Sequence, residues 1–349
     1  MSSTVATLPI PAEILHAYAI EPNAIIEEVS VGNINTTFKI TQADTSFIAQ
    51  TINQAVFKNP AVIDSNLRTV QDYLKIQDPN YLFPAPVPAQ SGATLTYDRK
   101  GMPWRLLMHI DNTDNFNTPP STEHAYQAAL AFASFTNRLS ALPTDALQET
   151  IPYFHNVSRY ETQLTDVLQS ATEDRLVQAK AVISELANYR YIGEQYRASI
   201  KNQTCRVRIH HHDTKLNNLL FHGGQPTVKA IIDLDTIMPG YFYSDLGDLV
   251  MFGASAFEDE TDLDKVVVNA AYYEAIMTGY HEGLRDTLSE TEKALMPLAG
   301  KVMCYMLTVR FLTDYLAGEI YFKTRYDGQN LDKARNRLKL LTELDQLHT

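Results

Sequence analysis

A short polar stretch near the middle of the chain combines the residue types that phosphoryl transfer needs. Asp213, Lys215 and Asn218 lie within six residues in HHDTKLNN, and Asp233 follows twenty residues after Asp213 at the end of an apolar run. A carboxylate can orient an attacking hydroxyl and accept its proton, and Mg²⁺ takes oxygen ligands such as amides and carboxylates. The spacing therefore predicts a phosphoryl-transfer site.

Each of these four side chains has its own predicted role. Asp213 is the predicted catalytic base, and Lys215 would hold the transferring phosphoryl group as negative charge develops on it. Asn218 and Asp233 are the predicted Mg²⁺ ligands, with ATP as the phosphoryl donor. The spacing of Asp, Lys and Asn matches the protein-kinase catalytic loop, although Leu-Asp-Thr follows Asp233 where a kinase has Phe-Gly.

The motif alone has a plainer explanation, since Asp and Asn in loops often close turns or cap helices. The order of the surrounding segments favours the functional interpretation: an apolar strand, the polar loop, a strand, a turn, and a second strand that ends at Asp233. The three consecutive histidines are not predicted to bind zinc, because adjacent residues point in different directions and no second His or Cys cluster has ligand spacing. His211 is predicted to be a buried hydrogen-bonding anchor, and His210 and His212 have no assigned role.

Composition is that of an ordinary globular enzyme. The chain has 349 residues, 45% hydrophobic and 20% charged, which is enough for two lobes with a sizeable core. A net charge of −12 argues against nucleic acid as a partner, because phosphate backbones need clustered Lys and Arg. Two cysteines cannot form a disulfide framework, and no signal peptide or membrane-length apolar window is found. These features predict a cytoplasmic protein with small-molecule partners and no membrane partner; they do not specify its oligomeric state.

The first part of the chain has features of a nucleotide-binding lobe, predicted over residues 1–110. Residues 25–52 alternate between apolar and polar side chains as antiparallel strands do. Their first turn is small and polar, so its backbone N–H groups could approach phosphates, although a plain β-turn is an equal alternative. The predicted nucleotide-covering residues are Gly32, Asn33, Ile34 and Asn35.

The third strand of this segment lacks the phosphate-binding lysine that a kinase carries there. Gln50 stands in its place, and it can donate a hydrogen bond to a phosphate but brings no charge. In the helix predicted from Pro60, only Asp64 or Ser65 stands where a lysine-pairing Glu would be. The helix has apolar residues at spacings of 4, 3 and 4, which places them on one face. They are Ile63, Leu67, Val70 and Leu74.

A polar, proline-terminated stretch over residues 109–120 is predicted to be the hinge between two lobes. Backbone groups near Met108, His109 and Ile110 are expected to contact the adenine. Residues 111–349 are predicted to form a C-terminal catalytic and substrate lobe made mainly of helices. The predicted fold class is therefore α+β, with a small antiparallel sheet first and helices after it.

Several stretches together resemble a known superfamily. HHDTKLNN, IIDLDTIMPGYFYSDLGD and VGNINTTFKI resemble the aminoglycoside phosphotransferase and choline kinase superfamily. FIAQTINQAVFKNP, GMPWRLL, ETIPYFHN and RFLTDYLAGEIYFK resemble its N-acetylhexosamine 1-kinase branch and are spread over nearly the whole chain. The resemblance implies a protein-kinase-like two-lobe fold, with Asp213 as the base and Asn218 and Asp233 as Mg²⁺ ligands. In that branch a glutamine at the position of Gln50 is usual.

The resemblance also implies where the acceptor binds. Arg310 and Tyr321 would reach the sugar, and His155 is expected near the same site. From chemistry alone, the helix that carries Arg310 could equally be a core helix with a buried ion pair to Asp314, one turn away. An arginine, a tyrosine and a histidine suit a neutral, hydroxyl-rich sugar better than a cationic acceptor.

The expected activity is ATP- and Mg²⁺-dependent phosphorylation of the anomeric hydroxyl of GlcNAc or GalNAc. One alternative is a kinase of another small alcohol, such as an aminoglycoside, choline or a different sugar. A second is a nucleotide-binding pseudokinase, which Gln50 motivates but which the presence of the base and both metal ligands disfavours. No GxxxxGK[ST] phosphate loop of other sugar-kinase folds is found. The sequence does not determine the preferred hexosamine, the nucleotide or the pathway.

Overall fold

The protein is described by a computed structural model that covers residues 9–29, 35–255, 259–285 and 287–347. The predicted residues Gly32, Asn33 and Ile34 lie outside this part of the chain. Two compact units are formed, each from three segments. The first unit comprises residues 1–113, 145–152 and 232–238, and the second comprises residues 114–144, 153–231 and 239–349.

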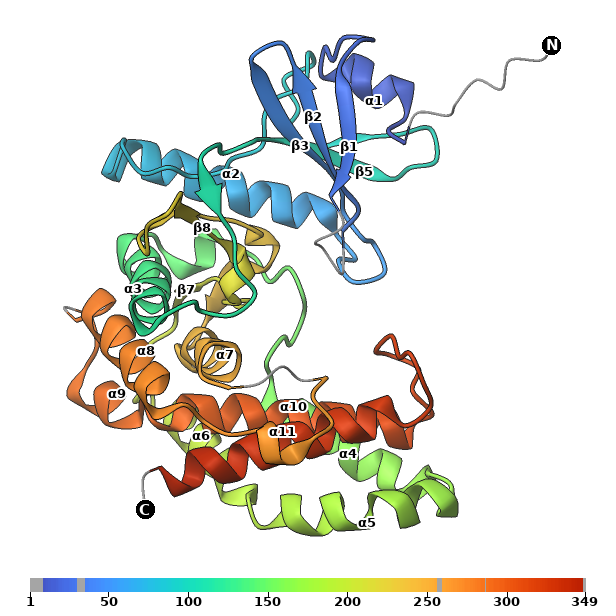
Figure 1. The fold of residues 1–349 in the computed structure, drawn as a ribbon, viewed down its shortest axis with the longest axis vertical. Coiled ribbons are helices and arrows are strands. Elements are labelled where there is room, and N and C mark those ends of the chain that lie inside the picture. Colours follow the sequence, from blue (N-terminus) through green and yellow to red (C-terminus); the bar gives the residue numbers. More distant parts are fainter. Residues whose placement is uncertain (1–8, 30–34, 256–258, 286, 348–349) are drawn as a thin grey trace. The chain divides into compact units, whose positions relative to one another are not determined.

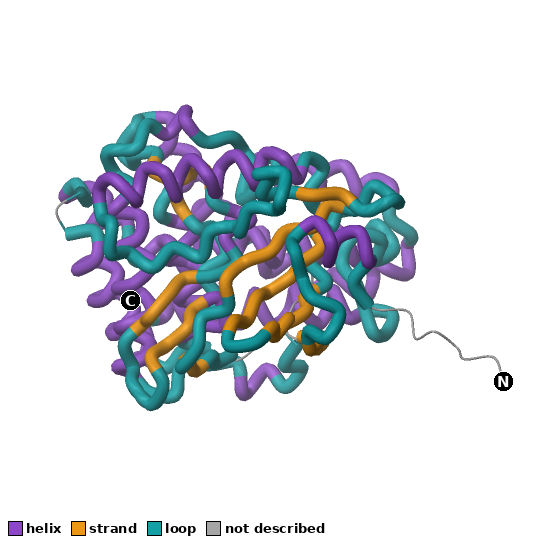
Figure 2. The backbone as a smooth tube through the Cα atoms, turned by 90° about the horizontal axis from the view of Figure 1, so that it is seen from above, coloured by secondary structure: helices purple, strands orange, loops and turns teal. Residues whose placement is uncertain are grey.

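The first unit is built on a five-stranded antiparallel sheet in the order β1-β2-β3-β5-β4 (Figures 1 and 2). Its strands are β1 (Ile25–Val29), β2 (Thr37–Gln42), β3 (Thr45–Thr51), β4 (Thr96–Tyr97) and β5 (Pro103–Met108). In the ladder between β3 and β5, Gln50 is the direct partner of Arg105. Directly opposed residues share one face of a sheet, so these two side chains are neighbours.

Apolar side chains from one face of this sheet form the core of the first unit. Phe38, Ile40, Ala49, Trp104 and Leu106 are all buried there, against the short helix α1 (Ala12–Ala17) and its flanks. Alternation along β2 and β5 brings these residues to one side, because successive strand residues point to opposite faces. The predicted strand segment over residues 25–52 is confirmed.

Helix α2 (Pro60–Gln77) also belongs to the first unit. It begins with proline at a position where a missing N–H leaves no hydrogen bond unmade. The predicted apolar stripe is confirmed: its four residues are buried, namely Ile63, Leu67, Val70 and Leu74. Asn66 lies on the same side and its amide donates to the main-chain carbonyls of Gln148 and Ile237, at 2.8 and 3.0 Å, which ties three segments of the unit together.

The second unit is mainly helical, as predicted for the C-terminal part (Figure 1). Its α-helices are α3 (Thr122–Arg138), α4 (Val157–Ser170), α5 (Glu173–Ala187), α6 (Arg190–Lys201), α7 (Tyr243–Gly253), α8 (Ala270–Gly283), α9 (Glu290–Leu295), α10 (Leu298–Leu316) and α11 (Gln329–Gln346). Short strands are β6 (Thr113–Asp114), β7 (Arg208–His210), β8 (Leu219–His222), β9 (Val228–Ile231) and β10 (Met238–Gly240). Short 3₁₀ turns are η1 (Thr144–Ala146), η2 (Leu216–Asn218), η3 (Leu234–Thr236) and η4 (Leu263–Lys265). Of these elements, η3 lies in the first unit, and β6, β10 and η1 each have residues in both units.

Helix α10 is the centre of the second unit. It is apolar on nearly all sides, and it packs against α4, α5, α6, α7 and α11. Gly247 on α7 permits a close approach, because a Cβ there would lie 2.2 Å from Met303 Cγ and 2.7 Å from the carbonyl oxygen of Ala299. This packing fixes α7, which contacts the turn η2 of the predicted catalytic loop. Within the described residues, no helix is both long and apolar enough to cross a membrane.

Candidate functional site

The predicted catalytic loop connects strand β7 to the turn η2 in the second unit. Three of its predicted residues come together in the structure. Lys215 Nζ lies 3.0 Å from Asp213 Oδ1, and the Asn218 amide donates to Asp213 Oδ2 at 3.0 Å and to the Asp213 carbonyl at 2.7 Å. Asp213 and Lys215 keep 24% and 43% of their side-chain surface exposed, whereas Asn218 is buried. The loop thus presents a carboxylate and an ammonium group side by side.

The neighbours of Asp213 favour its ionised form. Partial burial raises the pKa of its carboxyl, but the charges of Lys215 and His211 and the hydrogen bonds from Lys215 and Asn218 outweigh this, so the pKa lies below its usual value. An ionised carboxylate can orient a hydroxyl and accept its proton once the hydroxyl is being transferred. The electrostatics therefore suit the role of base.

Asp245, in the first turn of α7, holds the catalytic loop from behind, and sequence reasoning did not assign it a role. Its buried carboxylate accepts the main-chain N–H of His211 at 3.2 Å and of His212 at 2.7 Å, and it lies 3.2 Å from His210 Nδ1. Thr214 Oγ1 donates to the Asp245 carbonyl at 2.6 Å. Although burial alone would raise it, the three histidines hold the pKa of Asp245 far below its usual range. Two acids in a largely apolar helix, Asp245 and Asp248, were the sequence signal for this support.

The three histidines are buried and are parts of the loop's support. His211 is fully buried, its Nδ1 accepts the N–H of Asp213 at 3.2 Å, and its ring meets that of Phe132 edge-on. The predicted anchoring role of His211 is therefore confirmed. His212 Nδ1 lies 2.9 Å from Ser244 Oγ. Gly240 makes room for the His212 ring, since a Cβ there would lie 2.2 Å from Cε1.

Asp248, one turn after Asp245 on α7, is a second buried carboxyl behind the loop. It accepts the main-chain N–H of Thr214. Burial and the negative charges of Asp213 and Asp245 raise the pKa of Asp248 well above its usual value, against the opposing effect of Lys215. The pKa values of the two aspartates of α7 are thus shifted in opposite directions, and the sequence offered no way to distinguish them.

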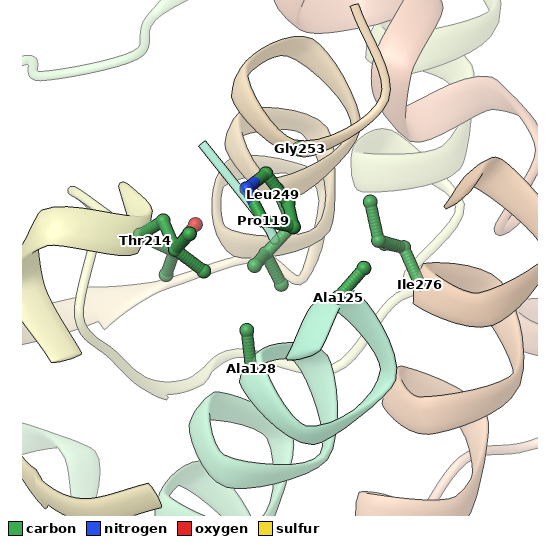
Figure 3. Close-up of a pocket in the computed structure, with 8 residues that line it drawn as sticks. Pro119, Ala125, Ala128, Thr214, Leu249, Gly253 and Ile276 are labelled. Atoms are coloured by element: carbon green, nitrogen blue, oxygen red, sulfur yellow. The ribbon is translucent and has the colours of Figure 1, made fainter. Parts of the chain in front are cut away.

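A small apolar cavity lies behind the catalytic loop (Figure 3). Thr214 and Leu216 form its loop side, and the rest of its lining comes from α3, α7, α8 and the segment before α3. Those lining residues are Pro119, Ala125, Ala128, Leu249, Gly253 and Ile276. Because the Thr214 hydroxyl already donates to Asp245, the cavity offers few polar groups to a phosphate or a sugar.

Asp233 lies in the first unit, at the N-terminus of η3. Its backbone is left-handed, with φ 56° and ψ 54°. His212 (φ 67°) and His155 (φ 59°), in the second unit, are left-handed as well. Such conformations cost a non-glycine residue roughly 1–3 kcal/mol and are concentrated at functional sites. All three residues belong to, or adjoin, predicted site residues.

Gln50 has protein partners in this structure. Its Nε2 donates to Thr37 Oγ1 at 3.1 Å, and its Oε1 accepts from Arg105 Nη2 at 2.8 Å. Arg105 also forms an ion pair with Asp235, both side chains being buried. Asn35, the one described residue of the predicted nucleotide turn, donates to Asp235 Oδ2 at 2.8 Å. Sequence reasoning missed both Arg105 and Asp235.

The predicted adenine-contacting residues follow the end of β5 in the first unit. The main-chain N–H of His109 donates to the Ser46 carbonyl at 3.1 Å, which continues the sheet pairing. The Ile110 carbonyl accepts from Thr113 Oγ1 at 3.2 Å. Met108 is about half exposed, at 48%. The structure therefore presents the Met108 side chain at this edge, whereas the His109 N–H and the Ile110 carbonyl already have partners within the unit.

In the second unit, Arg310 of α10 lies among three aromatic rings. Its guanidinium carbon is 4.9 Å from the ring centroid of Tyr160, 5.8 Å from that of Tyr321 and 5.2 Å from that of Phe322. Asp314 has other partners: it accepts the main-chain N–H of Ile320, Tyr321 and Phe322 at 2.8–3.0 Å and the amide of Asn330 at 2.9 Å. The alternative of a buried ion pair between Arg310 and Asp314 is therefore wrong.

His155 lies beside the catalytic loop, and the charge of Arg310 acts on it. Its ring stacks on Phe154 with centroids 3.9 Å apart, and its Nδ1 lies 2.5 Å from Ser244 Oγ, the same hydroxyl that His212 contacts. Burial, His212 and Arg310 hold the pKa of His155 well below its usual value. His155, Arg310 and Tyr321 are thus parts of one neighbourhood in the second unit.

The donor chemistry of the predicted metal ligands fits Mg²⁺. The Asn218 amide nitrogen donates to Asp213, which assigns its carbonyl oxygen as the atom available for a cation, and Asp233 contributes a carboxylate. Among the residues that the structure describes, no group of three or more His, Cys, Asp or Glu side chains could hold a metal.

Comparison with solved structures shows which known proteins this chain is similar to. The chain is similar in structure to a microcompartment-associated aminopropanol kinase (TM-score 0.64, 16% identity, 96% of each chain covered). It is also similar to an aminoglycoside phosphotransferase from Alicyclobacillus acidocaldarius (0.64, 14%, 99% of this chain and 98% of the other). An amicoumacin kinase in complex with AMP-PNP and Ca²⁺ gives a TM-score of 0.61 at 13% identity, with 96% and 95% covered.

These similarities confirm the predicted fold class, a protein-kinase-like α+β fold. The resemblance to the superfamily is confirmed by a family match over most of the chain. The N-acetylhexosamine branch stays a prediction. Residues 25–290, which include the strands of the first unit, the catalytic loop and Asp245, match a described family over most of the chain. The chain belongs to the phosphotransferase enzyme family.

Proposed function

We propose that the protein transfers the γ-phosphoryl group of ATP, with Mg²⁺, to the anomeric hydroxyl of an N-acetylhexosamine. The observation that carries the proposal is the setting of Arg310, a cation held among Tyr160, Tyr321 and Phe322 in the same neighbourhood as His155 and the catalytic loop. Aromatic faces and a guanidinium suit a sugar ring with hydroxyl and acyl oxygens.

The charge of this neighbourhood disfavours cationic acceptors. Arg310 and Lys215 both act on His155 as positive charges, and both favour its neutral form. An amino alcohol or aminoglycoside would bring an ammonium group next to these cations, and the carboxylate of Asp213, which is already paired with Lys215, would offset only part of the repulsion. A kinase of a small amino alcohol, as suggested by the similarity to an aminopropanol kinase, is therefore the second candidate.

The residues of the chain have the following proposed roles. Residues 1–110 bind the nucleotide, with Asn35, Gln50, His109 and Ile110 near it, and residues 109–120 are the hinge. Residues 111–349 carry the base loop and the acceptor. Asp233 and Asn218 hold Mg²⁺, which neutralises charge on the phosphates. The binding of AMP-PNP and a divalent cation by a protein of the same fold supports this assignment of donor and metal.

The bonds, the leaving group and the proton of the proposed transfer step are all accounted for by ATP, the sugar and side chains of the protein. The bond between the γ-phosphorus and its bridging oxygen breaks as O1 of the sugar bonds to phosphorus, and ADP leaves with the bond's electron pair. Asp213 accepts the proton of the O1 hydroxyl late in the step. Lys215 is paired with Asp213 in this structure and would follow the developing charge to the phosphoryl oxygens.

The test is a screen of free GlcNAc, GalNAc, aminoglycosides, choline and aminopropanol with MgATP, with ADP release as the readout. We expect turnover with the two hexosamines, a 1-phosphate identified by phosphorus–carbon coupling, and no turnover with their methyl glycosides, in which O1 is blocked. Sustained turnover on a methyl glycoside, or a 6-phosphate product, would refute transfer to O1. Turnover on aminopropanol but on neither hexosamine would favour the second candidate.

A further inference from the structure

Arg105 is a buried cation in the first unit. It lies on β5 and keeps only 4% of its side-chain surface exposed. Its Nε and Nη2 donate to Gln50 Oε1 at 3.1 and 2.8 Å, and its Nη1 lies 2.5 Å from Asp235 Oδ1. Removing such a charge from water is unfavourable unless it is paired and hydrogen-bonded, and Arg105 is both. These partners offset the cost of burying the charge of Arg105.

The carboxylate that receives Arg105 belongs to the loop of the predicted metal ligand. Asp235 lies two residues after Asp233, in the turn η3, and is 2% exposed. Its second oxygen accepts from the Asn35 amide at 2.8 Å, and Asn35 Oδ1 accepts the main-chain N–H of Asn53 at 3.0 Å. Asp235 thus connects the metal-ligand loop to β5 and to the segment before β2.

Helix α2 does not provide this carboxylate. Asp64, the acid nearest to the position of a lysine-pairing Glu, accepts instead from Arg68 Nε at 3.1 Å and from Thr94 Oγ1 at 2.5 Å. Gln50 stands where a kinase has its strand lysine, and Arg105 is its direct partner in the neighbouring strand. A kinase would carry this cation on the third strand and its acidic partner on the following helix. Here the cation is Arg105 on the neighbouring strand β5, and its acidic partner is Asp235 in the loop of Asp233.

We propose that Arg105 is a positioning residue that replaces the missing strand lysine by holding the loop of Asp233 in its metal-binding conformation through Asp235. Gln50 fixes the guanidinium in the plane that faces Asp235, because its Oε1 receives two of the N–H groups. The inference rests on the proposed role of Asp233 and not on the identity of the acceptor. It predicts that loss of Arg105 weakens nucleotide and metal binding and leaves acceptor recognition intact.

The test compares two buried arginines. Arg208 is a matched control, because it is 6% exposed and pairs with the buried Glu292 at 2.7 Å, but it lies in the second unit. The dissociation constant of MgADP is measured by calorimetry without acceptor, together with the melting temperature of the nucleotide-free protein. We expect Arg105→Gln and Asp235→Asn to weaken MgADP binding roughly 10- to 100-fold, as loss of an outer-shell partner of a metal site does. Arg208→Gln should lower the melting temperature and leave the MgADP affinity unchanged.

A double variant tests whether the position of the charge matters. Because Gln50 and Arg105 face each other in the ladder, Gln50→Lys with Arg105→Gln restores a cation beside Asp235 from the neighbouring strand. We expect this variant to recover most of the MgADP affinity and to keep the wild-type KM for the acceptor. If it binds MgADP no better than Arg105→Gln, a facing cation is not what the loop needs and the proposal is wrong.

A conservative variant keeps the proposal testable if Arg105→Gln does not fold. Arg105→Lys retains the charge but cannot contact Gln50 and Asp235 as a planar fork, so we expect weaker MgADP binding and faster amide exchange over residues 232–238. Wild-type affinity and exchange in Arg105→Lys would overturn the proposal, as would equal MgADP affinities in Arg105→Gln and Arg208→Gln. A wild-type enzyme that phosphorylates a different acceptor would refute the proposed substrate and leave this inference standing.

Discussion

Two buried aspartates support the loops that carry the predicted base Asp213 and the predicted metal ligand Asp233, and they do so through different contacts. Asp245, in the second unit, holds the base loop by accepting main-chain N–H groups of His211 and His212. Asp235, in the first unit, holds the loop of Asp233 through side chains, those of Arg105 and Asn35. One loop is therefore held through its own main-chain N–H groups, and the other through side chains that are distant in the sequence.

This difference has consequences for how the two loops respond to change. Main-chain donors are kept in every substitution except one to proline, so the geometry of the base loop depends mainly on Asp245 itself. The support of the metal loop is divided among several side chains, each of which can be altered separately. We therefore expect an abrupt loss when the base-loop anchor is changed and graded losses when the metal-loop network is changed.

The largest effect is expected at the base itself. Asp213→Asn keeps the shape of the side chain but cannot accept the hydroxyl proton, so turnover should fall by roughly two to four orders of magnitude. The dissociation constant of MgADP should remain close to that of the wild type, since the nucleotide is held by other residues. Steady-state kinetics and calorimetry measure the two quantities, and a variant that retains most of its turnover would contradict the role of Asp213.

The next largest effect is expected for substitution of Asp245, and Asp248 on the same helix provides a matched control. Asp245→Asn removes the negative charge that two main-chain N–H groups face, and a hydrogen bond to a charged group contributes about 1.5–3 kcal/mol to the free energy of unfolding. Asp248→Asn replaces a carboxyl whose raised pKa already favours the neutral form, so its effect should be small. Urea denaturation of both variants checks this. Equal losses would show that the two carboxyls of α7 do not differ in charge.

Each of the two loops carries one predicted metal ligand, Asp233 on one and Asn218 on the other. Asp233→Ala removes a charged oxygen ligand and Asn218→Ala a neutral one, so both should raise the Mg²⁺ concentration needed for half-maximal activity, Asp233→Ala more. For Asp233→Ala we expect an increase of at least roughly tenfold, the lower end of what even an outer-shell change produces. Mg²⁺ titrations at saturating ATP measure it. Titration curves that coincide with that of the wild type would refute the assignment.

The smallest effect is a pH dependence of stability next to the base loop. The pKa of His155 lies well below its ordinary value of 6.5 in the folded protein. Below pH 6.5 the unfolded chain binds a proton that the folded chain does not, so stability is complete above this pH and decreases as the pH falls, by up to about 1.4 kcal/mol per pH unit. His155→Asn, which tolerates the left-handed backbone, should decrease less in unfolding experiments between pH 7.5 and 5.5. A slope equal to that of the wild type would contradict the prediction.

The sequence by itself determined the parts of the protein that depend on neighbours along the chain. Asp213, Lys215 and Asn218 lie within one loop, so their spacing was enough to predict that they would meet, and they do. Helix α2 and the first strands were likewise visible in the period of their apolar residues. The fold class follows from the order of such local segments, because each segment buries one apolar face.

Tertiary structure alone decided which distant side chains support the site. Asn35 meets Asp235 across 200 residues of sequence, and Gln50 meets Arg105 across 55. No periodicity links such positions, since strand pairing and loop packing bring them together only after folding. In the sequence, no cation appeared to replace the lysine that is missing at Gln50, because that cation, Arg105, stands on a neighbouring strand. The partner of a buried ionic group is set by the fold, and a sequence shows only that one is needed.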